Sequence, residues 1–327
     1  MRFHRFFEAV YRDNQLRRAP NRRRLARDFA LYVRNRALEP IDAMLRAKHG
    51  RTDLPVVFIV GAPRSGTTVL YQLIAEYVDV GFVNNRMARY FAAPVLGAML
   101  HGRTGGGHQL ALSSEHGRTA GDHSPHEFSW FWHYHGDFRL YDDLSDEELA
   151  SMDGQPIKRA LEGLAGYFER PLVVKNINFV SYQITWLKRL IPRAKFIWIQ
   201  RDDRYTAQSI MRVREEEYGD RKVWWSIRPR DAASWHDRSP VEQVSHQIRD
   251  LSRAIETAFE ALPGEDRLTL EYESLMREPS RTLRRVARFM GADLADEAGL
   301  EALTLETRNH RTVDDETWTQ IQTALAP

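Results

Sequence analysis

The fold of this 327-residue chain is decided by the stretch Val56-Val57-Phe58-Ile59-Val60-Gly61-Ala62-Pro63-Arg64-Ser65-Gly66-Thr67-Thr68. Its first five residues are β-branched or aromatic, a run typical of a parallel strand buried on both faces. A glycine-containing loop follows, and apolar residues then recur at helical spacing up to residue 77. The order of strand, loop and helix predicts a βα unit within an α/β domain.

The loop of residues 61–68 has the features of an anion-binding site. The start of the following helix offers unpaired N–H groups and about half a positive charge. Glycines let the backbone approach a ligand closely, and three hydroxyl side chains lie nearby. The spacing resembles the ATP-binding pattern G-x-x-x-x-G-K-S/T, but Thr67 stands at the lysine position and Arg64 carries the charge. This departure counts against an ATP-dependent small-molecule kinase, which remains the alternative enzyme.

The rest of the chain continues the α/β pattern. Strands are predicted at residues 172–174, 196–199 and 267–271, and helices at 182–190, 240–262 and 279–290. Alternating strands and helices imply right-handed crossovers and a parallel sheet covered on both faces. We therefore expect a P-loop-like α/β fold with three layers and helical additions at both ends. The expected division is a basic helical extension over residues 1–50 and an α/β domain over 51–327, with a long loop or lid at about 101–135.

Residues 61–68 resemble the 5′-phosphosulfate loop of the sulfotransferases that use 3′-phosphoadenosine 5′-phosphosulfate (PAPS). The likeness is to the arginine-bearing form found in tyrosylprotein sulfotransferases and many bacterial relatives. A second match is Arg201, which follows the strand of residues 196–199, with Ser209 eight residues later. In the family such a pair binds the 3′-phosphate, and a guanidinium and a hydroxyl so placed can converge on one phosphate. The resemblance covers roughly residues 55–292.

Two more segments strengthen the resemblance. Lys175 ends the strand-like run Val173-Val174-Lys175-Asn176 and corresponds to the family's lysine beside the transferred group. Tyr272, with Pro279 and Gly291 after it, matches a family segment whose tyrosine lies near the nucleotide. The resemblance thus implies that Arg64 and Lys175 stabilise the transferred group. The residues that it implies for donor binding are Arg64, Ser65, Gly66, Thr67, Thr68, Arg201, Ser209 and Tyr272.

The expected reaction is direct in-line transfer of a sulfuryl group from PAPS, the co-substrate, to an acceptor hydroxyl. The chain has no cysteine, which excludes a thiolate nucleophile and cysteine-ligated metal. The histidine spacings do not match a helix-borne zinc motif, so we expect no metal. The family's glutamate after the phosphate-loop helix is replaced by Asn84 and Asn85. The candidates for the base are instead Glu127 and His123, in a segment that resembles the S-P-x-E run of bacterial relatives.

The acceptor is expected to be a small molecule, apolar or lipid-like. The aromatic residues that follow Glu127 either line its pocket or pack in the core. Weaker candidates, which no motif supports, are an acceptor rim and a closing segment over the nucleotide. The rim would contain Trp224, Trp225, Arg228 and Arg230, and the closing segment Asn309 and Arg311.

The net charge of +2 conceals an asymmetry. Residues 1–36 contain eleven arginines against three acidic residues, a local charge of +8, which indicates contact with an anionic partner. Within this arm, apolar side chains share one helical face: Phe3, Phe6, Phe7, Val10 and Tyr11. The pattern fits a helix at a membrane surface or one docked on its own domain or a sister subunit.

The arm also bears on location and partners. No apolar run reaches the length of a membrane span and the start lacks a secretory core, so we expect a cytoplasmic protein with peripheral membrane contact through residues 1–36 as one alternative. A non-catalytic peripheral membrane protein is the competing class. We expect no nucleic-acid partner, and the sequence leaves the oligomeric state open.

Overall fold

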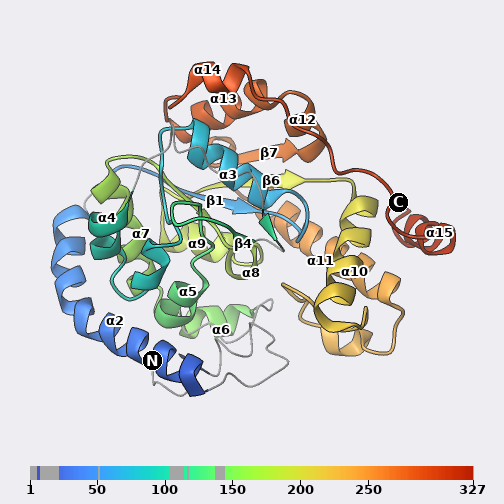
Figure 1. Cartoon of the computed structure of the whole chain (residues 1–327), viewed down its shortest axis with the longest axis horizontal. Coiled ribbons are helices and arrows are strands. Elements are labelled where there is room, and N and C mark those ends of the chain that lie inside the picture. The colour runs from blue at the N-terminus through green and yellow to red at the C-terminus, as the bar shows by residue number, and fades with distance from the viewer. Residues whose placement is uncertain are drawn as a thin grey trace.

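A five-stranded parallel sheet forms the centre of the molecule (Figure 1). The computed structural model describes residues 6–7, 22–50, 52–102, 114–115, 118–136 and 144–326. The strand order is β2-β5-β1-β6-β7, and every neighbouring pair is parallel. The strands are β1 (Val56–Val60), β2 (Gly81–Phe82), β5 (Leu172–Lys175), β6 (Lys195–Gln200) and β7 (Arg267–Glu271). The predicted parallel sheet and four of its strands are confirmed, whereas the two-residue β2 was not predicted.

Helices cover both faces of this sheet (Figure 1). A two-residue antiparallel pair, β3 (Ser114–Glu115) and β4 (Arg118–Thr119), stands apart from it. The longer helices are α2 (Arg22–His49), α3 (Thr67–Tyr77), α4 (Pro94–His101), α5 (Ser129–Gly136), α7 (Gln155–Phe168), α9 (Ile184–Leu190), α10 (Asp203–Tyr218), α11 (Pro240–Glu260), α13 (Pro279–Met290) and α15 (Asp315–Ala324). The short ones are α6 (Asp146–Ser151), α8 (Ile177–Val180), α12 (Tyr272–Arg277) and α14 (Glu297–Glu301). The three-layer α/β architecture with helical additions at both ends is therefore as predicted.

The alternation of side chains in β1 explains the three layers. Val57 and Ile59 face one cluster of buried residues, which α3, α12 and α13 complete. Phe58 and its neighbours two residues away face a second cluster, to which α5, α7 and α9 contribute. All five residues of β1 are buried, because each face of a parallel strand must be covered by helices.

The segment predicted as a long loop or lid at 101–135 needs correction. Residues 103–113 and 116–117 lie outside the described residues, so the prediction is not compared with the structure there. Residues 129–135, however, belong to helix α5. Phe131 and Trp132 are fully buried there, with ring centroids 5.5 Å apart, so this aromatic segment is core. Its aromatic density reflects packing against the sheet, not an open loop.

The aromatic residues Phe6 and Phe7 dock on the domain itself. Phe6 is fully buried, with its ring centroid 5.1 Å from that of Tyr32 and 5.3 Å from that of Phe91. Of the two alternatives for the basic arm, docking on its own domain therefore holds for these two residues. Phe3, Val10 and Tyr11 lie outside the described residues. The division into an extension of residues 1–50 and a domain of 51–327 stays a prediction.

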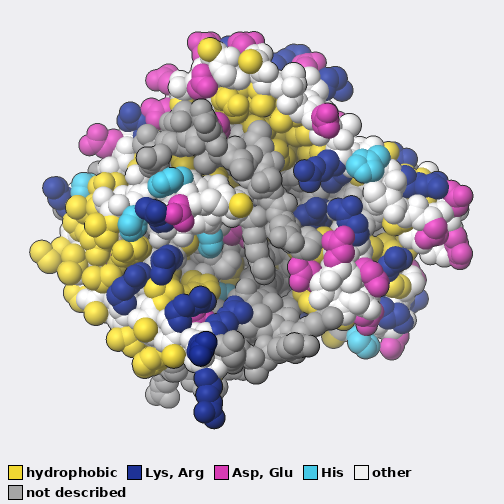
Figure 2. Space-filling view, in the orientation of Figure 1, with side chains coloured by type: hydrophobic (Ala, Val, Ile, Leu, Met, Phe, Trp, Pro, Cys, Tyr) yellow, Lys and Arg dark blue, Asp and Glu magenta, His cyan; other side chains and the backbone are white. Residues whose placement is uncertain are grey.

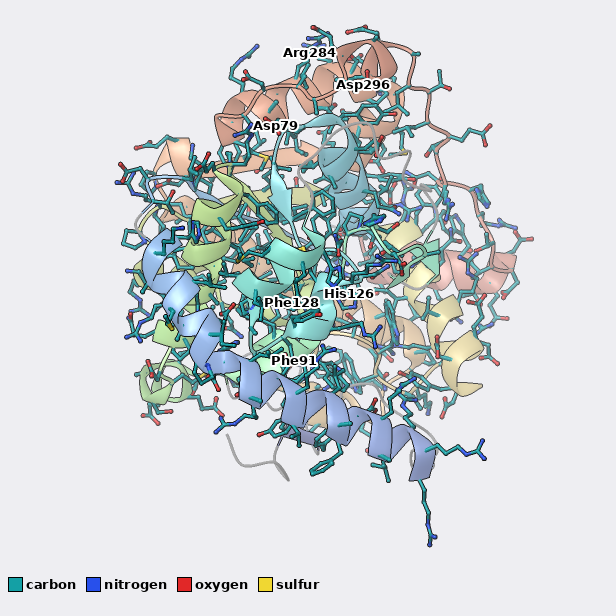
Figure 3. All side chains as sticks on the ribbon, turned by 60° about the vertical axis from the view of Figure 1, so that its left-hand side comes forward. Asp79, Phe91, His126, Phe128, Arg284 and Asp296 are labelled. Carbon is teal, nitrogen blue, oxygen red and sulfur yellow. The ribbon has the colours of Figure 1, made fainter. Side chains whose placement is uncertain are left out.

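Buried polar side chains attach helix α2 to the domain. Asn35 donates to the carbonyl of Arg89 and accepts from the N–H of Ala92, each at 2.9 Å. Two turns further along α2, Asp42 accepts from the N–H of Leu96 at 2.9 Å, near the start of α4. Figure 3 shows α2 lying across this region, with Phe91 behind it. These bonds satisfy backbone groups that would otherwise be buried without partners.

Replacing Asn35 with alanine should destabilise the protein. The change leaves the buried Ala92 N–H without its partner, whereas the Arg89 carbonyl still accepts from Arg34 at 2.6 Å. One orphaned group costs about 1–3 kcal/mol, so we expect the free energy of unfolding to fall by about that amount in chemical denaturation. The matched control on the same helix is Arg23→Ala, an exposed position expected to change it by less than about 0.5 kcal/mol. Equal effects of the two variants would contradict the anchoring role.

Candidate active site

The candidate site lies where the carboxyl ends of four parallel strands meet. The loop of residues 61–66 follows β1, Lys175 is the last residue of β5, Arg201 follows β6 and Tyr272 follows β7. Parallel pairing brings all of these to one edge of the sheet, the usual place for a ligand in such folds. A cavity of about 640 Å³ opens there. Its lining includes Arg64, Gly66, Thr67, Thr68, Gln72, Glu127, Lys175, Arg201, Tyr272 and residues 304–308.

The loop after β1 depends on backbone conformations that favour glycine. Gly66 has φ of 99° and a Cβ at this position would lie 2.6 Å from the Tyr272 ring. Gly61, at φ of 151°, would bring a Cβ within 2.7 Å of the Ile199 carbonyl oxygen. Helix α3 begins at Thr67 without a side-chain cap, and Gly66, Thr67 and Thr68 at its start line the cavity. The loop thus combines close packing with an open helix start.

Guanidinium groups gather around this loop without carboxylate partners. Arg64 Nε donates to Ser209 Oγ at 2.9 Å, and Arg201 donates to the Arg64 carbonyl oxygen at 2.9 Å. Burial, and then the nearby charges of Arg212, Arg201 and Arg308, lower the pKa of Arg64 to about 10. Within the described part of the chain, neither Arg64 nor Arg201 forms an ion pair with a carboxylate. Buried cations so arranged favour an anionic ligand.

Arg201 is held in place by contacts on several sides. Its guanidinium carbon lies 4.7 Å from the centre of the Tyr272 ring, and its Nε donates to Asn309 Oδ1 at 2.8 Å. Asn309 in turn donates to Glu273 at 2.6 Å. Burial is the main cause that lowers the pKa of Arg201. The result is an oriented guanidinium beside an aromatic face.

The segment after α14 crosses over the cavity. Residues 304–308 and His310 line it, and the Arg308 N–H donates to the Tyr272 hydroxyl at 3.2 Å. Sequence reasoning named Asn309 and Arg311 here, but it missed Arg308. Arg311 forms an ion pair with Asp315 instead of lining the cavity. Nothing in the local pattern distinguishes Arg308 from the chain's many other arginines, so only the tertiary structure identifies it.

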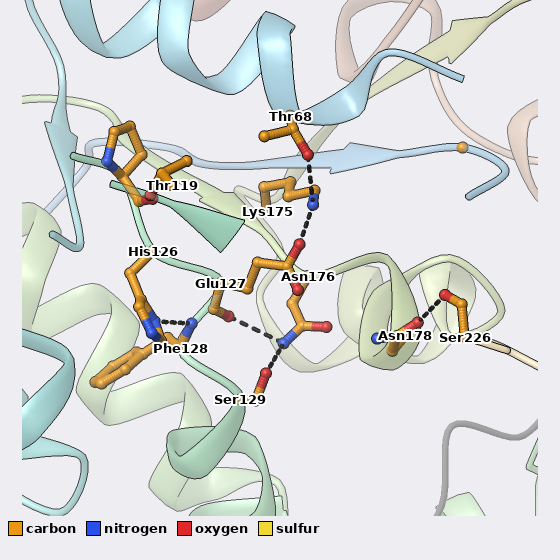
Figure 4. A network of polar contacts seen from close by, with 12 residues as sticks. Thr68, Thr119, His126, Glu127, Phe128, Ser129, Lys175, Asn176, Asn178 and Ser226 are labelled. Atoms are coloured by element: carbon orange, nitrogen blue, oxygen red, sulfur yellow. Dashed lines mark hydrogen bonds and ion pairs between the residues drawn. The ribbon is translucent and has the colours of Figure 1, made fainter. Parts of the chain in front are cut away.

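Lys175 connects Thr68, at the end of the loop that follows β1, to Glu127 (Figure 4). Its ammonium group donates to Thr68 Oγ1 at 3.1 Å and forms an ion pair with Glu127. Lys175 is only 3% exposed, whereas Glu127 is 27% exposed and lines the cavity. One cation therefore lies between a loop hydroxyl and a carboxylate that a ligand can reach.

The backbone around Glu127 is fixed on both sides. Asn176, next to Lys175, donates to the Glu127 carbonyl oxygen at 2.9 Å (Figure 4). His126 Nδ1 accepts from the N–H of Phe128 at 2.7 Å, and burial lowers the pKa of His126 to about 4, so that its ring is neutral at pH 7. Phe128 has φ of 61°, an unusual value for an aromatic residue. These contacts hold the carboxylate of Glu127 toward Lys175.

The two asparagines that stand in place of the family's glutamate have structural partners. Asn84 accepts from the N–H groups of Arg86 and Met87 at 3.1 and 2.9 Å. Asn85 donates to the carbonyl oxygens of Thr119 and Gly121. Neither asparagine lines the cavity. They brace the segment that leads to Glu127.

Other candidates from the sequence lie away from the cavity surface. Ser65 is buried, and neither it nor Ser209 lines the cavity, although Ser209 binds Arg64. His123 does not line it. The described aromatic residues of α5 do not line it either.

Of the four residues predicted to form an acceptor rim, one lines the cavity. Trp225 lines the cavity, together with Ser226, whose hydroxyl donates to Asn178 at 2.7 Å (Figure 4). Trp224 instead stacks with the buried Arg214, 5.0 Å from ring centre to guanidinium carbon. Arg230 lines a separate cavity of about 220 Å³. Among the residues that the structure describes, no group of three His, Asp or Glu side chains could hold a metal ion.

Comparison with known proteins assigns the chain to a family. The family model described as "Sulfotransferase family" matches residues 55–296. The chain belongs to the sulfotransferase family. The match contains every strand of the sheet and every residue predicted for donor binding or catalysis, and it stops before the segment that carries Arg308, Asn309 and Arg311. The family resemblance inferred from the sequence is confirmed.

Individual sulfotransferases share little sequence identity with this chain. Protein-tyrosine sulfotransferase 1 of Danio rerio is 25% identical over 241 residues, which are 73% of this chain and 53% of that protein. The chain thus spans about half the length of this curated relative. The solved structure of sulfotransferase STF1 from Mycobacterium tuberculosis H37Rv has a TM-score of 0.51 at 14% identity, covering 90% of this chain and 81% of that one. This likeness confirms the fold.

Replacing Gly66 with alanine should destabilise this sulfotransferase, because the left-handed φ and the close Tyr272 ring both oppose a Cβ. We expect the free energy of unfolding to fall by about 1–3 kcal/mol, measured by denaturant titration. Gly264→Ala is the control, since no atom lies within 4 Å of its Cβ position and its φ is not positive. A neutral Gly66→Ala variant would show that the loop does not require the glycine conformation.

Proposed function

We propose that the chain is a PAPS-dependent sulfotransferase that moves a sulfuryl group to a hydroxyl of a small apolar or lipid-like acceptor. The observation that carries the proposal is the pair of half-buried guanidinium groups, Arg64 and Arg201, which form no ion pair with a carboxylate of the described residues and lie beside the uncapped start of α3. The same cavity contains Lys175 and Glu127. The cavity therefore brings together cations that can bind an anion and a carboxylate that can accept a proton.

The donor would be bound by residues from the strand ends. We assign its 5′-phosphate to the loop, with Thr67, Thr68 and the open N–H groups at the start of α3 as donors. We assign its 3′-phosphate to Arg201 and Ser209, whose link through Arg64 supports the pairing that the family resemblance implies. Ser65 keeps only a backbone role in this proposal, because its side chain is buried away from the cavity.

Transfer requires charge stabilisation and no covalent enzyme intermediate. The bond from sulfur to the donor's bridging oxygen breaks as the bond to the acceptor oxygen forms, and negative charge develops on the leaving phosphate. Arg64 and Lys175 are the cations assigned to the sulfuryl oxygens and the bridging oxygen. PAPS supplies the activated sulfuryl group.

Glu127 is the proposed base, in preference to His123. The acceptor loses its hydroxyl proton in the reaction, and a base must lie within hydrogen-bond reach of that proton. Glu127 lines the cavity and contacts Lys175, whereas His123 does not line it.

Apolar residues near Glu127 support the proposed acceptor class. Ile177 and Trp225 line the cavity next to the bonded pair Asn178 and Ser226. An apolar wall with a few polar groups is typical of a small-molecule pocket. We therefore propose an alcohol or phenol with an apolar body as the acceptor.

Adenosine 3′,5′-bisphosphate should stabilise the protein against heat, and ATP with Mg²⁺ should not. At a concentration one hundred times its dissociation constant, a ligand adds about 2.7 kcal/mol to the free energy of unfolding. Arg64→Ala should weaken bisphosphate binding by about tenfold to a hundredfold, because a charge-assisted contact is removed. Thermal-shift titration measures both effects.

The control is Arg285→Ala, an exposed arginine on α13 outside the cavity, which should bind the bisphosphate normally. Stabilisation by ATP and Mg²⁺ alone would favour the kinase alternative. Binding of neither nucleotide would favour a non-catalytic protein.

Glu127→Gln should reduce sulfuryl transfer from labelled PAPS by about 10²–10⁴-fold, the usual contribution of a general base. His123→Gln, the matched control, should keep its rate within about threefold, since this histidine does not line the cavity. The assay uses a panel of alcohols, phenols and lipids as acceptors. The reverse ranking of the two variants would assign the base to His123.

A further inference from the structure

Helix α2 leaves large apolar side chains in solvent. Its inward side combines the core residue Tyr32 with the fully buried Asn35 and Asp42, which bond to backbone groups of the domain. Away from that side, large apolar side chains are between two fifths and three quarters exposed: Leu25 (42%), Val33 (48%), Ile41 (50%) and Met44 (76%). The solvent side of a surface helix is ordinarily polar.

Neighbouring residues of α4 enlarge this outward face. Met99 and Leu100 are 48% and 56% exposed, and α4 packs beside α2. Figure 2 shows hydrophobic side chains gathered on the left flank of the molecule, over α2 and α4. Of the eight large exposed hydrophobic residues in the described chain, all but Val223 belong to these two helices. A patch so concentrated marks a contact surface.

The patch cannot be hidden by turning the helix. Rolling α2 inward to bury Val33, Ile41 and Met44 would break the hydrogen bonds of Asn35 and Asp42. The N–H groups of Ala92 and Leu96, which donate to these side chains, would then lose their partners. The apolar side of α2 is therefore held outward by the fold.

Positive charges flank the patch. Helix α2 contains eight Arg and Lys residues and three acidic residues, and two of those three, Asp28 and Asp42, are buried on the inward side. Arg22, Arg23 and Lys48 are exposed. At 100° per residue, these three lie on the same half of the helix as Val33 and Met44. Figure 2 shows Lys and Arg side chains beside the hydrophobic ones.

We propose that this outward face of α2 and α4 docks on a membrane surface containing anionic lipid. Apolar side chains bordered by cations are the features of an interfacial helix, and the stretch from Leu25 to Met44 extends about 28 Å along the surface. A twofold contact with a second copy would bring the same cations against each other, which is unfavourable. Anionic headgroups complement them instead. The inference does not depend on the proposed enzymatic activity.

The test is sedimentation of the full chain with vesicles, without donor or acceptor. The protein should bind vesicles of phosphatidylcholine mixed with phosphatidylglycerol, and should bind vesicles of phosphatidylcholine alone more weakly. The triple variant Val33→Gln, Ile41→Gln and Met44→Gln should bind the mixed vesicles at least about tenfold more weakly, because it removes apolar area that would enter the interface. Its thermal unfolding should match that of the unchanged protein, since these side chains face solvent.

Three more variants sharpen the result. Val223→Gln is the matched control, an exposed apolar residue outside the patch, and should bind mixed vesicles normally. Met44→Gln alone, at the most exposed position, should still weaken binding, and it serves if the triple variant does not fold. Replacing Arg22, Arg23 and Lys48 with glutamine should remove most of the preference for phosphatidylglycerol.

Normal vesicle binding by the triple variant, or by Met44→Gln if only that variant folds, would overturn the proposal. So would failure of the unchanged protein to bind mixed vesicles. Light scattering gives the competing result: a dimer that the triple variant dissociates, without vesicle binding, would identify a second copy as the occupant of this face.

Discussion

Parallel pairing of the central strands is the constraint on which the rest of the molecule depends. Because β1, β5, β6 and β7 run in one direction, the loop after β1, Lys175, Arg201 and Tyr272 meet at one edge. An antiparallel neighbour would have sent one of these groups to the far side of the sheet. Burial then intensifies the effect, since the cations at this edge have little water to screen them.

The site also depends on contacts between segments that are far apart in the chain. Tyr272 illustrates this, because its ring packs against Gly66 and Arg201 while its hydroxyl accepts from the Arg308 N–H. The segment around Arg308 lies beyond residues 55–296, which match the family model. The closing segment therefore lies outside the part of the chain that matches the family model, whereas the loop after β1 lies within it.

Helix α2 meets a different requirement. Its buried Asn35 and Asp42 satisfy backbone groups near α4, and this fixes which side of the helix faces outward. Large apolar side chains concentrated on the outward side are costly in water, so the arrangement is informative about the surroundings of this helix. Phe6 and Phe7, which have the stronger aromatic pattern in the sequence, are instead buried in the domain. The surface available for docking is thus not the one that the aromatic pattern indicated.

The sequence by itself determined the parallel sheet and the anion-binding character of the loop of residues 61–68, because both follow from local signals. The run Val56–Val60 is apolar throughout, which indicates a strand buried on both faces. Gly66 and the hydroxyl residues after it can be recognised as a loop and helix start from the neighbouring residues alone. The sequence also named Glu127 and His123 as candidates for the base. Only the tertiary structure shows that Glu127 lines the cavity and His123 does not, because that position depends on partners such as Lys175 and Asn176, about fifty residues away. The same holds for Arg308 and for the outward side of α2, since exposure is a property of packing and not of residue type.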